Sequence, residues 1–154
     1  MTEVFQFIRD SRRAFIELLD TLTLEQLNEI PAGYNNNIIW NFGHIVVSTQ
    51  GLCYTRSGIR PDTNDISYFS TYAKGTKPTY FVDQAEVDAL KKLAIDTIDV
   101  LQRDYEANVF ADFSPFETST YKATLHTIED VIVTTAGHDN WHFGYATAQK
   151  RSIK

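Results

Sequence analysis

The residues with the clearest potential for chemistry are histidines. The chain has four of them, and His138 and His142 are four residues apart. In an α-helix, residues at this spacing project from the same face about one turn apart, near enough for two imidazoles to bind one metal ion. Two buried imidazoles without an ion would each need hydrogen-bond partners, and a proton on either would be an unpaired buried charge. Spacing alone leaves both readings open: a metal-binding pair, or two histidines satisfied by hydrogen bonds.

A third candidate ligand is His44. It lies in the uncharged run from Asn37 to Thr55, next to Gly43, which has no side chain to hold a neighbouring element away. On its own, His44 fits a hydrogen-bonded core residue equally well. His126 precedes His138 by twelve residues, which would place it about 120° away around an extended helix. The hypothesis is therefore that His44, His138 and His142 hold one divalent metal ion, with His126 excluded.

The acid nearest to these histidines in sequence is Asp139. The segment HDNWH at 138–142 resembles the H-E-x-x-H helix of zinc proteases, but aspartate replaces the glutamate that acts there as general base. Aspartate is one methylene shorter and would reach the reacting water poorly, so a protease is disfavoured. Asp139 is instead a candidate to orient a ligand by a hydrogen bond, and the spacing identifies no general base.

The single cysteine, Cys53, is the other potential nucleophile. On a helical projection it lies among apolar residues. This position favours a buried, inert thiol over a reactive one.

Four segments with helical hydrophobic period must position these residues. The first runs from about Thr2 to Leu22, with its arginines, Arg12 among them, expected mostly on the outer side. The second runs from Asn37, its N-cap, to about Ser57, and is apolar nearly all round except for a narrow arc; that arc holds Asn41, His44, Ser48 and Thr55. The others run from about Asp83 to Asn108 and from about Thr127 to the basic tail at Lys150. The expected fold is an all-α four-helix bundle.

Three connecting segments complete the chain. Thr23 and Gln26 predict a capping box for a short helical turn that closes at Pro31. The segment Ile59 to Val82 has turn formers and aromatic residues without a period, which indicates a long crossover that either packs on the bundle or covers a pocket as a lid. The segment Phe110 to Leu125 is expected to be a loop. The pattern W-x-F-G occurs at 40–43 and again at 141–144, either by chance or because two helices meet around one site.

Composition limits the remaining possibilities. A chain of 154 residues and 17.6 kDa with 43% hydrophobic residues predicts one domain over 1–154. The net charge of −6 and pI of about 5.1 disfavour nucleic acid and anionic membranes as partners. The longest uncharged run carries several polar groups, so it predicts a buried helix and not a membrane span. One cysteine and an N-terminus without a signal pattern predict a cytoplasmic location.

The sequence resembles the DinB-like superfamily, which includes bacillithiol S-transferase-type proteins. The resemblance rests on IIWNFGHI around His44, on HDNWHFG at 138–144 and on TLTLEQLNEIPAG after the first helix, and it covers nearly the whole chain. It implies a four-helix bundle in which a histidine of the second long helix and an HxxxH pair of the last one bind a divalent ion, commonly zinc or nickel. By motif, these ligands correspond to His44, His138 and His142.

Three neutral imidazoles leave coordination positions open, as in catalytic zinc sites. The resemblance implies a metal-dependent enzyme with a small-molecule substrate, such as a low-molecular-weight thiol that is transferred as a metal-bound thiolate. Two alternatives stay open: a hydrolase that uses metal-bound water, and a non-catalytic metal-binding stress-response protein. A homodimer formed through the aromatic segment belongs to the last alternative.

Overall fold

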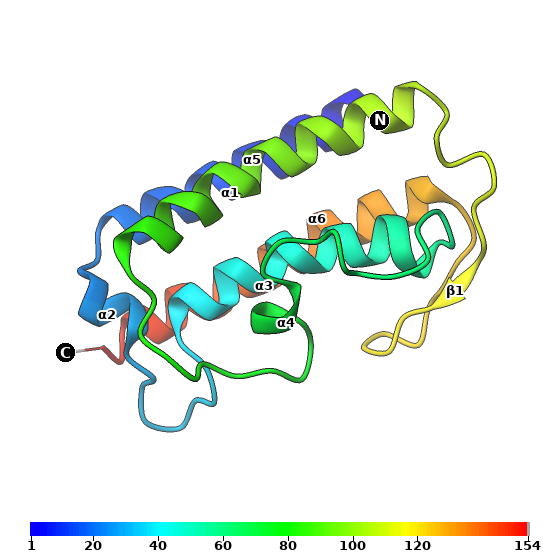
Figure 1. Ribbon diagram of the computed structural model, residues 1–154. Helices are drawn as coiled ribbons and strands as arrows, with labels where there is room; N and C mark the ends of the chain where they lie inside the picture. The colour runs from blue at the N-terminus through cyan, green and yellow to red at the C-terminus, as the bar shows by residue number, and fades with distance from the viewer. Residues whose placement is uncertain (154) are drawn as a thin grey trace.

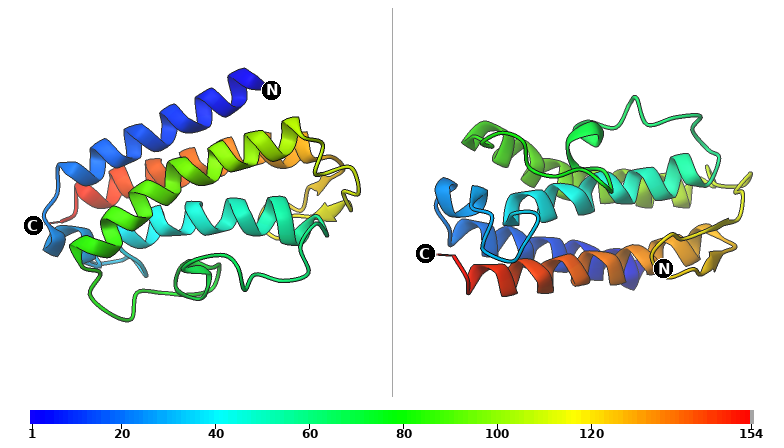
Figure 2. Two further views of the ribbon diagram at one scale, coloured as in Figure 1. Left: turned by 45° about the horizontal axis from the view of Figure 1, so that its top comes forward. Right: turned by 90° about the horizontal axis from the view of Figure 1, so that it is seen from below.

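Four long helices form a bundle in the computed structural model, which describes residues 1–153. They are α1 (Thr2–Asp20), α3 (Ile38–Gln50), α5 (Gln84–Glu106) and α6 (Ile128–Lys150). Around the bundle each packs on two neighbours, in the order α1, α5, α3, α6 and back to α1 (Figures 1 and 2). The prediction of an all-α four-helix bundle is confirmed.

The direction of the helices explains the long connection in the middle of the chain. The colours in Figure 1 show that α3 and α5 run the same way, while α1 and α6 run the opposite way. Parallel neighbours cannot be joined by a short turn, because the chain must first return along the length of the bundle. The segment from Ser57 to Asp83 makes this return, which confirms the predicted crossover.

The crossover is more ordered than predicted. It contains the short helix α4 (Phe69–Tyr72), which packs against α3 on the outside of the bundle (Figures 1 and 2). Ile66, Tyr72 and Val82 are buried in the same apolar cluster as the residues of α3. A four-residue helix is too short to show a hydrophobic period in the sequence.

Side-chain caps fix the helix boundaries where the sequence placed them. Thr23 and Gln26 form a reciprocal capping box at α2 (Leu24–Asn28), and Asn37 accepts a hydrogen bond from Trp40 N at the start of α3. Beyond Gln50 the helix continues without a break as the π-helix η1 (Gly51–Arg56). The predicted helix therefore has the expected length, but its last six residues are π-helical instead of α-helical. It ends before Gly58, whose φ of 80° suits glycine.

One detail of the expected secondary structure was incomplete. The segment Phe110 to Leu125, predicted as a loop, contains a small antiparallel hairpin of β1 (Phe116–Glu117) and β2 (Thr124–Leu125). Two-residue strands are too short for alternation to be visible in the sequence.

No helix within residues 1–153 has the length and apolar character needed to cross a membrane.

Arg12 lies in the centre of the bundle, and the prediction that it faces outward is wrong. Its side chain is fully buried and donates hydrogen bonds to Asp139 Oδ2 (2.7 Å), Thr49 Oγ1 (2.7 Å) and the Ala94 carbonyl (2.8 Å). These acceptors belong to α6, α3 and α5, so one guanidinium ties α1 to the three other long helices. Its position between Ile8 and Phe15 is on the buried face of α1, and the paired carboxylate makes the buried charge tolerable there.

Candidate metal centre

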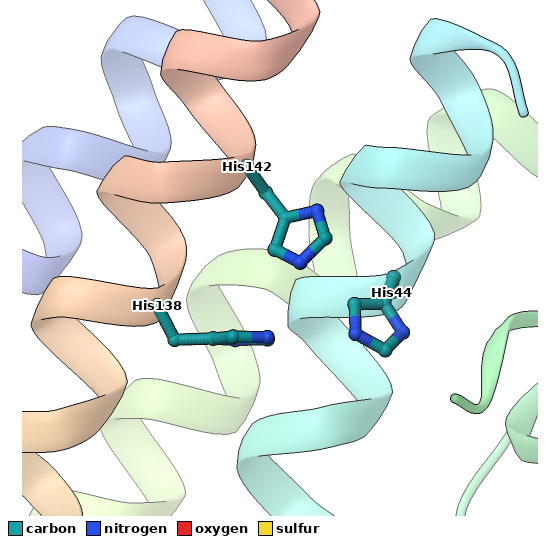
Figure 3. Close-up of side chains that lie close together, drawn as sticks. All are labelled: His44, His138 and His142. Carbon is teal, nitrogen blue, oxygen red and sulfur yellow. The ribbon is translucent and has the colours of Figure 1, made fainter. Parts of the chain in front are cut away.

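The structure brings together the three histidines that the sequence singled out. His44 projects from α3, and His138 and His142 project from α6, toward one point (Figure 3). Three ring nitrogens, one from each histidine, lie within 4.8 Å of one another. Their ring centroids are 4.6 to 5.2 Å apart. The fourth histidine, His126, is exposed at the start of α6 and lies outside the cluster, as expected.

Hydrogen bonds donated by Nδ1 hold two of the three imidazoles in a fixed orientation. His44 Nδ1 lies 2.7 Å from the Tyr72 carbonyl oxygen, and His142 Nδ1 lies 2.8 Å from Asn41 Oδ1. Since both partners are acceptors, Nδ1 carries the proton in each ring and Nε2 keeps its lone pair. An imidazole held in this way is prepared to donate Nε2 to a metal ion.

Asn41 is itself held by its surroundings. It is fully buried, and its Nδ2 donates to the Asn37 carbonyl (2.9 Å) and to Gln149 Oε1 (3.0 Å). With its amide group fixed, the oxygen must face His142. Sequence reasoning placed Asn41 on the polar arc of its helix but missed this role. The available signal was its position three residues before His44, because residues three apart share a helix face.

Tyr72 reaches His44 because Gly43 has no side chain. A Cβ at Gly43 would lie 2.6 Å from ring atoms of Tyr72, so the glycine allows α4 to pack closely on α3. The expected close approach at Gly43 is therefore found, with α4 as the neighbouring element. On its other side, the His44 ring stacks on Trp40, with centroids 4.8 Å apart and planes 10° apart.

The environment keeps all three imidazoles neutral. Burial lowers the pKa of His44, and the nearby Lys74 lowers it further, against the opposing effect of the Tyr72 carbonyl. Burial and the repulsion of the neighbouring imidazoles lower the pKa of His138 to about 3, and burial with repulsion from His44 lowers that of His142 to about 4. Neutral imidazole is the form that binds metals, so the histidines are ready to act as ligands at neutral pH.

Neither Asp139 nor Cys53 takes part in the cluster. Asp139 follows His138 directly, but a step of one residue turns the side chain about 100° around the helix, and its carboxylate binds Arg12. The expectation that Asp139 could orient a ligand is therefore wrong. Cys53 is fully buried, and burial raises the pKa of its thiol to about 12. This confirms the prediction of a buried thiol.

The three histidines open into a cavity of about 510 Å³. Its walls come from α3 and η1, from α6, from the crossover and from the hairpin loop between β1 and β2. Among the described residues that line it, none is acidic, whereas Arg56 and Lys74 are cationic. The crossover contributes Thr63, Phe69, Lys74 and Gly75, so this segment both packs on the bundle and walls the cavity.

The repeated W-x-F-G pattern corresponds to two helices that meet at this site. Trp40 and Trp141 both line the cavity, one from α3 and one from α6. Behind the histidines, Phe42 and Phe143 pack on the same ring, that of Phe15, at centroid distances of 5.1 and 5.4 Å.

This arrangement fits a divalent ion. Three neutral, closely spaced imidazoles from two helices supply nitrogen donors, and their hydrogen bonds set the tautomer of two of them. Imidazole suits zinc, nickel, copper and iron, and three protein ligands leave positions for a substrate.

Comparison with known proteins gives one informative match. No curated protein matches the chain. The sequence profile described as the DinB superfamily matches residues 8–146. This range includes all three histidines, the whole of α3 and α5, and most of α1 and α6. The chain therefore belongs to the DinB superfamily.

Proposed function

We propose that this protein is a metal-dependent enzyme that transfers a small thiol to an electrophile, with His44, His138 and His142 as the metal ligands. The observation that carries the proposal is the combination of three neutral imidazoles with an open cavity whose described lining contains no acidic side chain. Such a site has room for a substrate at the ion and presents no protein carboxylate to compete for the open positions.

When bound there, a divalent ion would lower the pKa of a coordinated thiol and hold the sulfur in its nucleophilic, deprotonated form near neutral pH. The protein keeps the imidazoles neutral by burial, and the Tyr72 carbonyl and Asn41 amide oxygen keep their Nε2 atoms available. The thiol proton passes to water through the open cavity. The sulfur then forms a bond to the electrophilic atom of the second substrate as the leaving group departs.

The lining of the cavity favours thiol transfer over hydrolysis. Hydrolysis at a metal site is commonly assisted by a carboxylate that accepts the proton of the attacking water. The acid nearest in sequence, Asp139, is buried and bound to Arg12. A thiol loses its proton more easily without a protein base, because its ordinary pKa of about 8.5 is far below that of water.

Aromatic residues offer a surface for the electrophile. Trp141 and Tyr121 are both about half exposed at the cavity, with ring centroids 5.8 Å apart. Tyr145 also lines the cavity and packs on Tyr34 at 5.3 Å. These rings would pack on an apolar or aromatic second substrate.

The test is the rate of thiol alkylation. The chain is loaded with zinc or nickel and incubated with 2-mercaptoethanol or cysteine and a fluorogenic alkyl halide, and the rate is compared with that of chelator-treated protein. We expect metal-dependent acceleration that is lost in His138→Ala and kept in His126→Ala. Absence of acceleration with either metal would refute thiol transfer. Metal-dependent cleavage of a nitrophenyl ester without thiol would point to a hydrolase, and metal binding without either activity to a non-catalytic protein.

A further inference from the structure

We propose that the cavity selects thiols that carry an anionic group, such as a carboxylate, and that Lys74 is the residue that binds this group. The inference rests on the proposed function, since it names the class of thiol that the site would accept. It begins from a contrast in charge. The whole chain has a net charge of −6, yet the described lining of the cavity contains two cationic residues and no acidic one.

Lys74 is one of several cations that form no ion pair in the part of the chain that the structure describes. Lys91, Lys92 and Arg9 form ion pairs with acids of the bundle surface, and Arg12 pairs with Asp139 in the core. None of the ion pairs found within residues 1–153 includes Lys74. Its Nζ donates to the neutral Ser119 Oγ at 2.6 Å. Its charge is therefore balanced by no carboxylate at contact distance, which leaves it available to an anionic ligand.

The position of Lys74 places this charge beside the metal ligands. It follows Tyr72 by two residues, so its Cα lies within about 7 Å of the Tyr72 Cα, and the Tyr72 carbonyl contacts His44 Nδ1. The charge of Lys74 is also one of the causes that lower the pKa of His44. A carboxylate two or three carbons from a sulfur at the metal would be in reach of its flexible side chain.

The wall around Lys74 suits the same group. Its partner Ser119 and the neighbours Thr118 and Thr120 line the cavity from the hairpin loop. Hydroxyl groups can donate hydrogen bonds to carboxylate oxygens. Lys74 thus joins two walls of the cavity, the crossover and the hairpin loop, at the place where an anionic tail would lie.

The experiment compares two thiols that differ in one charge, 3-mercaptopropionate and its methyl ester. Each is titrated into the cobalt(II)-loaded protein. The chain has two tryptophans, Trp40 and Trp141, and both line the cavity, so their fluorescence reports occupancy. The sulfur-to-cobalt charge-transfer absorption separately reports whether sulfur is bound to the metal. The variants are Lys74→Gln and, as a matched control, Lys77→Gln, which removes the same charge from an exposed residue of the same segment that does not line the cavity.

We expect the native protein and Lys77→Gln to bind the carboxylate about tenfold more tightly than the ester, as one charge-assisted hydrogen bond allows. In Lys74→Gln this preference should nearly disappear, and comparison between variants cancels the different acidities of the two thiols. Absence of a preference in the native protein, absence of binding, or the same preference in Lys74→Gln would overturn the inference. The last result would indicate that the carboxylate binds the metal directly. A Lys74-dependent preference without the sulfur-to-cobalt absorption would support the anion site and refute the thiol at the metal.

Discussion

Removing one member of the buried Arg12–Asp139 pair should destabilise the protein strongly. Both side chains are fully buried, and the guanidinium Nε lies 2.7 Å from Asp139 Oδ2. Arg12→Met keeps an apolar stem of similar length but leaves the carboxylate without its partner. Since burial raises the pKa of Asp139 and Arg12 opposes this rise, the variant must either keep an unpaired buried charge or take up a proton.

The expected cost follows from the kind of interaction lost. Breaking one side of a buried pair costs about 3 to 5 kcal/mol. For a domain of this size each kcal/mol lowers the melting temperature by about 2 to 4 °C, so Arg12→Met should melt roughly 6 to 20 °C lower. The double variant Arg12→Met/Asp139→Leu removes both charges and should recover most of this loss, because apolar replacements of a whole buried pair are often close to neutral.

The assay is urea unfolding of the native protein, both single variants and the double variant, followed by circular dichroism. The cost of Arg12→Met should also be smaller at about pH 5 than at about pH 8. Without Arg12 the folded-state pKa of Asp139 lies above its unfolded value of about 3.9, so stability is lost as the pH rises through the folded value. Single variants that each lose less than about 1 kcal/mol, or a double variant whose loss equals the sum of the two, would refute this account of the pair.

Three further predictions concern the site. Gly43→Ala should lose about 1 to 3 kcal/mol of stability in thermal unfolding, because the added methyl would meet the Tyr72 ring at 2.6 Å; an unchanged melting temperature would show that α4 shifts freely. Asn41→Ala should weaken zinc binding about 10- to 100-fold in competition with a chromophoric chelator, since it removes the acceptor that orients His142; native affinity would contradict that role. The chelator-treated protein should lose stability as the pH falls from about 6.5 to about 4, because unfolded histidines take up protons below about 6.5 whereas burial lowers the folded-state pKa of His138 to about 3 and that of His142 to about 4; a melting temperature that stays constant over this range would contradict buried, neutral imidazoles.

The fold could be predicted because its determinants are local. The cap residues Asn37 and Thr127 each accept a hydrogen bond from the backbone N–H three residues later. The hydrophobic period marks the buried face of each long amphipathic helix. Because α3 is apolar around nearly its whole circumference, the sequence predicted that it is buried on nearly all sides, as the structure shows. The His138 and His142 pair followed from the same reasoning, since a four-residue spacing fixes both on one face of α6. His44 was assigned to the same site with the support of the resemblance to the DinB-like superfamily.

What the sequence did not reveal depends on contacts between distant residues. Arg12 was placed outside because a charged residue is usually exposed, and its partner Asp139 is 127 positions away. The Tyr72 carbonyl that orients His44 belongs to a segment without periodicity, 28 positions from it. Such pairings become visible only when packing has brought the elements together.

The metal content of the purified chain decides whether His44, His138 and His142 hold a metal ion. Elemental analysis is applied to the native protein and to His44→Ala, His138→Ala, His142→Ala and the control His126→Ala, each prepared in the same way with excess metal removed. We expect about one divalent ion per chain in the native protein and in the control, and loss of most of it in each of the other three. Full occupancy in any of those three, or a native protein that retains no metal after loading with zinc or nickel, would contradict it.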